Sequence, residues 1–222
     1  MLCRRSTNTS FASASSTSIS NLFVFVIVFP VYLQIFEHPQ NVTQEELQQD
    51  LLLLPQWRRE KVLSYRFLID QVLCAKAYIL LKNGLRETYG ITENPAFEYV
   101  KHEKPVLRDY PDIHFNLSHC KHGVLCVIDD KPIGCDIEEI ETALDINLCH
   151  YCYNDSEVAD ILSAPDSCVA FTNLWTMKEA VLKLTGEGIN DNMKETLKNA
   201  NSEWFTTTER IDKNYLYTVC EQ

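Results

Sequence analysis

Residues 133–138 read Ile-Gly-Cys-Asp-Ile-Glu and alternate apolar with polar or small side chains. This period of two predicts a β-strand with one buried face. The stretch follows a β-prone run at 124–128 and a turn-forming Asp-Asp-Lys-Pro sequence, so we expect the second strand of a hairpin. Its polar face then carries Asp136 and Glu138, whose carboxylates can reach one hard cation, and Gly134, which leaves room for a ligand.

A helix is predicted at residues 171–185, because apolar side chains recur there at helical spacing and the pattern stops at Gly186. Glu179 and Lys183 lie four residues apart on the margin of that helix. Lys178 falls near the middle of the apolar stripe, where an ammonium group is costly unless something negative meets it. Such a local conflict often marks a functional site. Taken singly, the two segments also fit a solvated acidic pair and an ordinary helix-stabilising Glu–Lys pair.

A third segment, residues 113–119, reads Ile-His-Phe-Asn-Leu-Ser-His and alternates as a strand does. It ends in Ser118 and His119, small or neutral donors that can bind phosphate oxygens. A hydrolytic triad is not indicated, because no Gly-x-Ser-x-Gly elbow surrounds Ser118 and because adjacent side chains diverge on a strand.

In chain order, the motifs Phe-Asn-Leu-Ser-His, Gly-Cys-Asp-Ile-Glu and Trp-x-x-Lys-Glu-Ala-x-x-Lys-x-x-Gly-x-Gly-Ile strongly resemble those of the 4′-phosphopantetheinyl transferases of the surfactin-synthetase-activating type. Upstream, Lys104-Pro105 is similar to the family's Gly-Lys-Pro element, with Glu103 in the place of glycine. Further back, a basic region with Arg58 and Lys61 is similar to the family's N-terminal region, in which a helix would open at Arg66 and run through Leu81.

The resemblance implies an α+β fold of two similar halves, related by a pseudo-twofold axis, with the active site in the cleft between them. The halves would be residues 31–112 and 113–222, the second carrying the metal site, and residues 31–36 would form the opening strand. Residues 1–30 are expected to be a non-native or disordered apolar extension. The apolar run at 22–33 is too short to span a bilayer and lacks a small-residue cleavage site. Export or anchoring is the alternative.

By the same resemblance, the chain is expected to be a holo-carrier-protein synthase. A serine of an apo acyl or peptidyl carrier protein would attack coenzyme A, and adenosine 3′,5′-bisphosphate would leave. Asp136, Glu138 and Glu179 would hold a magnesium ion, Glu179 would also act as general base, and Lys183 would neutralise charge on the pyrophosphate. The residues expected to bind coenzyme A are Arg58, Lys61, Arg66, Lys104, Ser118, His119 and Lys178.

Composition bears on partners and compartment. The chain has 20 basic and 31 acidic residues, a formal charge of −11, which argues against general nucleic-acid binding. We expect a monomer without stable membrane association. Of the nine cysteines, Cys74, Cys126 and Cys135 lie in apolar patterns and are interpreted as buried free thiols, which suits a reducing cytoplasm. A zinc site at Cys149 and Cys152 is not favoured, because no recognised second ligand pair accompanies them.

Two other classes of function stay open. One is another magnesium-dependent phosphoryl-transfer or hydrolytic enzyme that acts on coenzyme A with the same carboxylates. The other is a non-catalytic protein that binds coenzyme A or a carrier protein. The presence of all three carboxylates and of Lys183 argues against the second, because a degenerate copy would be free to lose them.

Overall fold

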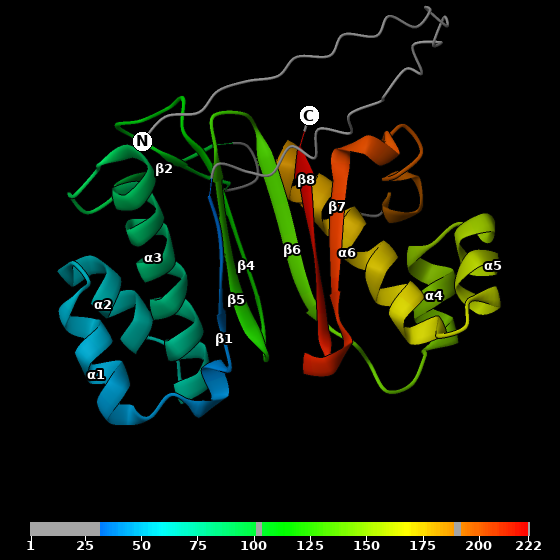
Figure 1. Ribbon diagram of the computed structural model, residues 1–222, viewed down its shortest axis with the longest axis horizontal. Coiled ribbons are helices and arrows are strands. Elements are labelled where there is room, and N and C mark those ends of the chain that lie inside the picture. Colours follow the sequence, from blue (N-terminus) through cyan, green and yellow to red (C-terminus); the bar gives the residue numbers. More distant parts are fainter. Residues whose placement is uncertain (1–31, 101–103, 189–191, 222) are drawn as a thin grey trace, which may run out of the picture.

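The computed structural model describes residues 32–100, 104–188 and 192–221, so the expected extension at residues 1–30 lies outside the described residues. These residues form both helices and strands, and the predicted α+β fold class is confirmed. Figure 1 shows two sheets in the centre of the molecule and helices on either side of them. Across the described ranges, every helix is too short or too polar to cross a membrane.

The first sheet is antiparallel and has the strand order β1-β5-β4. It consists of β1 (Tyr32–Glu37), β5 (Gly123–Asp129) and β4 (His114–Cys120). The hairpin of this sheet joins β4 to β5 across Lys121 and His122. The opening strand, expected at residues 31–36, is thus present as β1.

The second sheet has the order β6-β8-β7, from β6 (Ile133–Glu139), β8 (Tyr215–Glu221) and β7 (Phe205–Arg210). The strand predicted at 133–138 is confirmed, but its predicted pairing with the preceding strand is wrong. β6 pairs with β8 at the far end of the chain, and the turn after Asp129 carries the chain from one sheet to the other. Local sequence pattern does not encode a partner so distant along the chain.

The first sheet bears on the expected division of the chain. β4 and β5 complete the sheet that β1 begins, so a division between residues 112 and 113 would separate β1 from the strands of its own sheet. Between β1 and β4 the chain forms a separate two-stranded ribbon of β2 (Phe97–Tyr99) and β3 (Pro105–Leu107).

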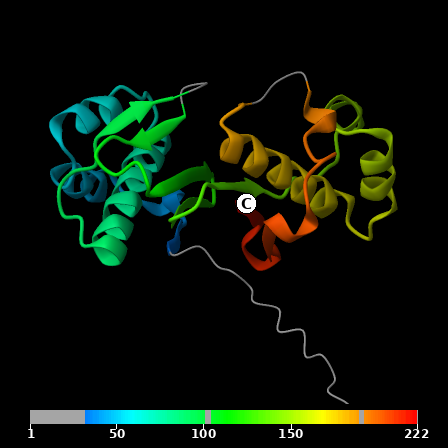
Figure 2. The same ribbon diagram turned by 90° about the horizontal axis from the view of Figure 1, so that it is seen from above.

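The helices cover the outer faces of the two sheets, as the view from above shows (Figure 2). α3 (Leu68–Tyr89) packs on the first sheet, with Leu81 and Leu85 in one core with Phe115 and Ile128. α6 (Ser167–Thr185) packs on the second sheet. The other helical elements are α1 (Gln44–Leu52), α2 (Gln56–Leu63), α4 (Ile146–Cys152), α5 (Asp155–Ser163) and the 3₁₀ turns η1 (Pro39–Asn41), η3 (Met193–Glu195), η4 (Ser202–Trp204) and η5 (Ile211–Lys213).

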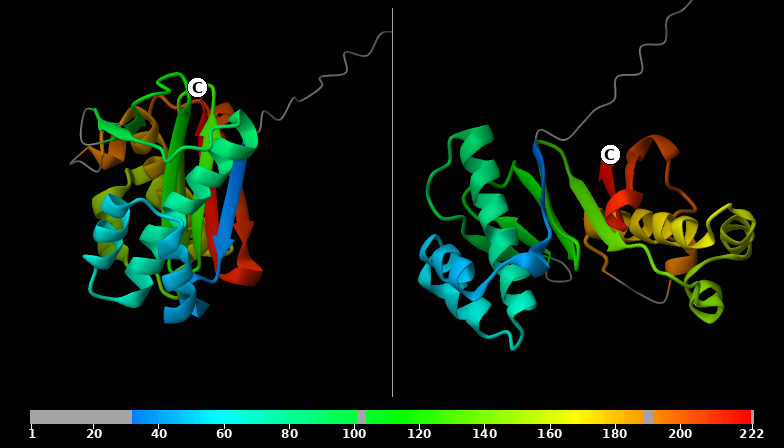
Figure 3. Two further views of the ribbon diagram at one scale, coloured as in Figure 1. Left: turned by 90° about the vertical axis from the view of Figure 1, so that its left-hand side faces the viewer. Right: turned by 60° about the horizontal axis from the view of Figure 1, so that its bottom comes forward.

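The inner faces of the two sheets share a core, so the molecule has a helix–sheet–sheet–helix order of layers (Figure 3). Leu125 and Val127 of β5 meet Ile133, Cys135 and Ile137 of β6 there. The predicted alternation of β6 is therefore confirmed. Its apolar side chains point into the core between the sheets, and its polar face is left for α6.

Candidate active site

Gly134 allows α6 to lie directly on the polar face of β6. A Cβ atom at this position would stand 2.0 Å from the carbonyl oxygen of Ala180, so any larger residue would push the helix away. The space expected for a ligand at Gly134 is therefore filled by the helix, and that prediction is wrong. The close approach brings Glu179 and Lys183, which flank Ala180 on α6, over Asp136 of β6.

Asp136, Lys183 and Ser118 form a hydrogen-bonded triangle across three elements. The Lys183 ammonium donates to Asp136 Oδ1 at 2.6 Å and to Ser118 Oγ at 2.9 Å. The Ser118 hydroxyl in turn donates to Asp136 Oδ1 at 2.7 Å. Asp136 is 1% exposed, so its charge needs these donors. The triangle joins β4 of the first sheet to β6 and α6 of the second.

The carboxylates around this triangle repel one another. Burial, and after it the neighbouring Asp136 carboxylate, raise the pKa of Glu138 to about 7, although the Trp175 side chain donates a hydrogen bond to Glu138. Burial and Asp136 also raise the pKa of Glu179, against the opposing effect of Lys183. Burial opposes the charge of Lys183, but its acidic neighbours outweigh this effect and raise its pKa. One ammonium group thus faces three carboxyl groups.

These residues fit a divalent cation by the chemistry of their donors. Asp136 Oδ2 and Glu179 Oε1 are buried and have no hydrogen-bond partner within the described residues. Carboxylate oxygens are the ligands that magnesium prefers, and a cation would relieve the repulsion that raises the pKa of Glu138 and Glu179. Over the described part of the chain, no three His, Cys, Asp or Glu side chains already form a metal cage.

A cavity of about 210 Å³ opens beside the triangle, between β4 of the first sheet and α6, which covers the second sheet. Its walls come from the segment before and at the start of β3, from β4, and from the C-terminal part of α6 with the residues that follow it. The lining residues are Lys104, Pro105, Phe115, Asn116, Leu117, Glu179, Leu182, Lys183, Gly186 and Gly188. Both parts of the chain thus build one cavity that contains a carboxylate and two lysines.

Lys104 bridges this cavity. Its ammonium group donates at 2.8 Å to the carbonyl oxygen of Leu184, near the C-terminus of α6. Burial lowers the pKa of Lys104, because the charged form loses hydration there. An anion in the cavity would give this ammonium group a stronger partner than a carbonyl oxygen does.

A second cavity of about 310 Å³ lies between α2, α3 and β4, and Leu117 lines both cavities. Its other lining residues are Arg58, Lys61, Tyr65, Asp70, Leu73, Cys74, Ala77 and His119. The His119 ring is accessible to solvent, but the surrounding protein and the Lys183 charge lower its pKa. The two cavities are therefore neighbours on either side of Leu117, and basic side chains outnumber carboxylates in both.

The predicted basic residues of the first half differ in their placement. Arg58 donates to the carbonyl oxygen of Cys74 at 3.0 Å, and Lys61 lies 5.2 Å above the Tyr65 ring. Both line the second cavity. Arg66 lines neither cavity; it precedes α3, is exposed, and lies 5.3 Å from the Phe67 ring. The helix expected to open at Arg66 begins at Leu68 and continues to Tyr89.

Lys178 also lies apart from the site. Its side chain is fully buried, with the ammonium group 2.9 Å from Glu157 Oε2 of α5. The negative group that its position in the apolar stripe required is therefore this carboxylate and not a ligand. The expectation that Lys178 contacts coenzyme A is corrected accordingly, since the side chain lines neither cavity and its ammonium group is already bonded within the protein.

Known proteins similar to this chain are 4′-phosphopantetheinyl transferases. A family model described as the 4′-phosphopantetheinyl transferase superfamily matches residues 132–220. The 4′-phosphopantetheinyl transferase psf-1 of Bacillus pumilus is 38% identical over 135 residues. The chain is thus a relative of the 4′-phosphopantetheinyl transferases. The resemblance inferred from the three motifs is thereby confirmed.

Two further members of the superfamily extend the comparison. The 4′-phosphopantetheinyl transferase Sfp of Bacillus subtilis is 25% identical over 195 residues, which cover 81% of this chain and 87% of that protein. The transferase gsp of Aneurinibacillus migulanus is 34% identical over 158 residues, 70% of this chain and 57% of that protein. The match to psf-1 covers 60% of this chain and 58% of that protein. The family model begins at residue 132, next to the start of β6, the first strand of the second sheet.

Two residues near the Asp136–Lys183–Ser118 triangle were not among the predicted site residues. Asn116 lines the first cavity and its side-chain oxygen accepts a contact of 3.7 Å from the Cys135 thiol. Its place beside Ser118 on β4, two residues away, was a usable signal. Thr218 of β8 lies opposite Asp136, and its hydroxyl contacts that of Thr176 at 2.8 Å. No sequence signal could show Thr218, because it depends on the pairing of β6 with β8.

Proposed function

We propose that the protein transfers 4′-phosphopantetheine from coenzyme A to a serine of an apo acyl or peptidyl carrier protein, releasing adenosine 3′,5′-bisphosphate. The observation that carries this proposal is that Asp136, Glu138 and Glu179 lie together around Lys183, beside a cavity that Glu179 and Lys183 line. Similarity to the transferase superfamily supports the reaction, and the two unpartnered carboxylate oxygens support a cation beside them.

Asp136, Glu138 and Glu179 would hold a magnesium ion that carries the pyrophosphate of coenzyme A. When bound, this ion would supply charge neutralisation for the pyrophosphate as it splits and the 5′-phosphate of adenosine 3′,5′-bisphosphate leaves. The three carboxylates differ in their hydrogen bonds. Asp136 accepts from Ser118 and Lys183, and Glu138 accepts from the Trp175 side chain. Glu179 Oε1 has no hydrogen-bond partner within the described residues.

Glu179 would accept the proton of the attacking serine, directly or through water. Burial raises the pKa of this carboxyl group, and a general base works best when its pKa approaches the working pH. Lys183 remains charged, because its acidic neighbours raise its pKa. Its ammonium group can therefore turn from Asp136 to a phosphate oxygen and neutralise charge there.

The two neighbouring cavities would hold coenzyme A between them. Lys104 and Lys183 line the first cavity and would meet the pyrophosphate there, and Ser118 would support Lys183 through their hydrogen bond. The adenosine 3′-phosphate would lie in the second cavity, where the ligands available to it are Arg58, Lys61 and His119. Arg66 and Lys178 are outside this set, because their side chains line neither cavity.

We further propose that the chain consists of two halves related by a pseudo-twofold axis, divided near residues 130–132. In both sheets the last strand of the half lies between its first strand and its middle strand, and one long helix covers the outer face. The protein would act as a monomer in the cytoplasm. Free cysteines support a reducing compartment, since all eight that the structure describes are unpaired and seven of them are buried.

Incubation with coenzyme A, magnesium and a panel of apo acyl and peptidyl carrier proteins tests the proposed reaction. At least one carrier should gain the mass of one phosphopantetheine group, and chelation of the metal should abolish the gain. Absence of any gain across the panel, with a folded protein, would refute the transferase proposal. Release of free phosphopantetheine without a carrier would instead identify a hydrolase.

A further inference from the structure

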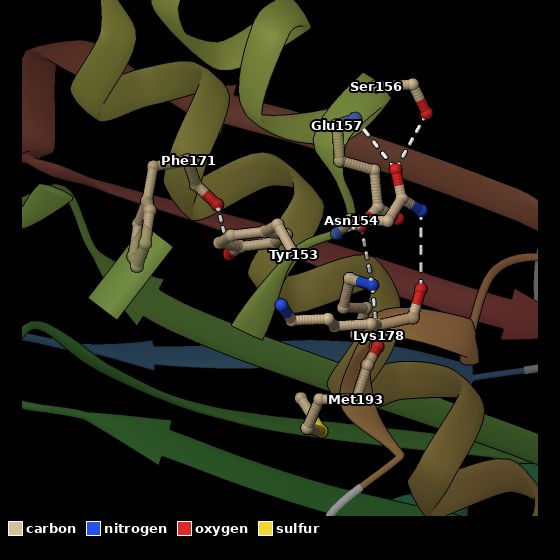
Figure 4. Close-up of polar contacts among 8 residues, drawn as sticks. Tyr153, Asn154, Ser156, Glu157, Phe171, Lys178 and Met193 are labelled. Atoms are coloured by element: carbon tan, nitrogen blue, oxygen red, sulfur yellow. Dashed lines mark hydrogen bonds and ion pairs between the residues drawn. The ribbon is translucent and has the colours of Figure 1, made fainter. Parts of the chain in front are cut away.

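A buried ion pair joins Lys178 of α6 to Glu157 of α5 (Figure 4). The Lys178 ammonium group lies 2.9 Å from Glu157 Oε2, donates to the carbonyl oxygen of Met193 at 2.7 Å, and lies 5.3 Å from the centre of the Tyr153 ring. Lys178 is 0% exposed and the Glu157 side chain 11% exposed. All three partners of the ammonium group therefore belong to this chain, and no ligand is needed to satisfy it.

Glu157 has a second task that fixes its position. It closes the capping box of α5: its Oε2 accepts the backbone N–H of Asn154 at 2.9 Å, and the Asn154 side chain accepts the N–H of Glu157 at 3.0 Å. The side-chain amide of Asn154 then donates to the carbonyl oxygen of Lys194 at 3.3 Å. Two adjacent carbonyl groups, those of Met193 and Lys194, are thus held by one cluster on α5 and α6.

These carbonyl groups lie a short distance along the chain from the wall of the first cavity. Gly186 and Gly188 line that cavity, and Met193 follows Gly188 by five residues. Asn192 and Thr196 also border a small hollow together with Val181, Leu182 and Glu187. The segment held by Lys178 therefore lies across this hollow from Leu182, which also lines the first cavity.

The position of α6 itself does not depend on Lys178. Gly134 lets the helix backbone contact β6, Lys183 bonds to Asp136, and the Thr176 hydroxyl meets that of Thr218 at 2.8 Å. Three contacts on the sheet side thus hold Glu179 in place. Loss of the Lys178 contacts should act on the segment that follows α6 and leave the helix where it is.

We infer that Lys178 is a positioning residue for coenzyme A binding: through the carbonyl oxygen of Met193 it fixes the segment at residues 192–196, which borders a hollow with Leu182 at the end of α6 that walls the first cavity. The inference rests on the proposed function for the identity of the ligand. It predicts a separation of kinetic effects that a residue in the reacting centre would not give. Affinity for coenzyme A should fall, while turnover at saturating coenzyme A should stay near the original value.

The variants must avoid an unpaired buried charge. Lys178→Met alone would leave Glu157 buried without its cation, which is strongly destabilising. The double variant Lys178→Met/Glu157→Gln removes both charges and keeps an acceptor for the capping box, since glutamine serves there as well as glutamate. A matched control is Lys76→Met/Asp50→Asn, which removes a partly buried ion pair of 2.7 Å between α3 and α1. Lys178→Arg retains a cationic donor and tests rescue.

The experiment combines calorimetric titration with coenzyme A, transfer kinetics and amide hydrogen exchange on the full chain. For Lys178→Met/Glu157→Gln, we expect Kd and KM for coenzyme A to rise about tenfold, as for the loss of a hydrogen bond from a charged group, with kcat within about twofold. Exchange at Met193–Glu195 should accelerate, that of α6 should not change, and Lys178→Arg should recover most of the affinity. The control pair should change neither Kd nor kcat.

Three outcomes would overturn the inference: unchanged affinity for coenzyme A, a fall in kcat at unchanged KM, or faster exchange throughout α6. Titration does not require turnover, so failure of the proposed function is separately visible. In that case the original chain would bind coenzyme A without modifying any carrier, or would not bind it at all.

Discussion

Replacement of Gly134 by alanine should separate α6 from β6 and disable the site without touching any charged residue. The new Cβ atom would stand 2.0 Å from the Ala180 carbonyl oxygen and 2.7 Å from the Leu184 nitrogen, both of them backbone atoms that cannot rotate away. The helix must retreat by about 1 Å to reach 3.0 Å, below which such contacts are essentially never found. The 2.6 Å bond between Lys183 and Asp136 would then exceed normal hydrogen-bond length.

A displacement of about 1 Å at a reacting centre can cost about 10²-fold in rate, and overpacking of this kind typically costs about 1–3 kcal/mol of stability. We therefore expect kcat/KM for carrier modification to fall about 10²-fold while the protein still folds. Gly90→Ala is the control, because Gly90 has a φ of 71° with no atom near its missing Cβ. This change should cost about 1–2 kcal/mol of stability and leave kcat/KM unaltered. Thermal melts and carrier mass measurements check both variants. Near-normal activity in a folded Gly134→Ala protein would refute the argument that helix approach sets the site.

The remaining predictions concern the charged and phosphate-binding groups. Asp136→Ala and Glu179→Ala should each lower kcat/KM about 10²-fold or more with folding preserved, as steady-state kinetics and circular dichroism would show; a variant with ordinary turnover at saturating magnesium would remove that residue from the metal site. His119→Ala should weaken the binding of coenzyme A but have little effect on the binding of 3′-dephospho-coenzyme A. Ser118→Ala should weaken the binding of both, because Ser118 contacts Asp136 and Lys183. Equal losses of affinity for the two ligands in His119→Ala would place His119 away from the 3′-phosphate. Burial and Asp136 raise the pKa of Glu138 to about 7, so this carboxyl group holds its proton in the folded state at pH values where it has lost it in the unfolded state. Without divalent cations, the melting temperature should therefore fall as pH rises from about 5 to about 8. Glu138→Gln should flatten this slope, and an unchanged slope would contradict the assignment.

The chemistry of the site was predictable from sequence because its key residues lie in short local motifs. Asp136 and Glu138 share a face through strand alternation alone, and Glu179 and Lys183 share one through helical spacing. The partner of β6 was not predictable, since the residues of β8 that pair with it lie near the end of the chain. The hairpin prediction failed for this reason, because the turn after Asp129 looks the same whether the chain returns or moves to another sheet.

Gly134 and Lys178 show a second limit of sequence reasoning. A small residue on a polar strand face indicates close approach of something, but only the packing of α6 shows that a helix backbone and not a ligand approaches. A lysine in an apolar stripe requires a negative partner, but the sequence does not say whether that partner is a substrate or a side chain from another helix. Glu157 supplies it from α5, in a capping box that already fixes its position.

The central claim is that Asp136, Glu138 and Glu179 together bind the divalent cation that carries the pyrophosphate of coenzyme A. Electron paramagnetic resonance of manganese, titrated into the protein with and without coenzyme A, tests it most directly. We predict one cation site per chain that coenzyme A tightens, and its loss in Asp136→Asn, a change of nearly equal size that keeps an acceptor for Ser118. Unaltered manganese binding in a folded Asp136→Asn protein would contradict the account.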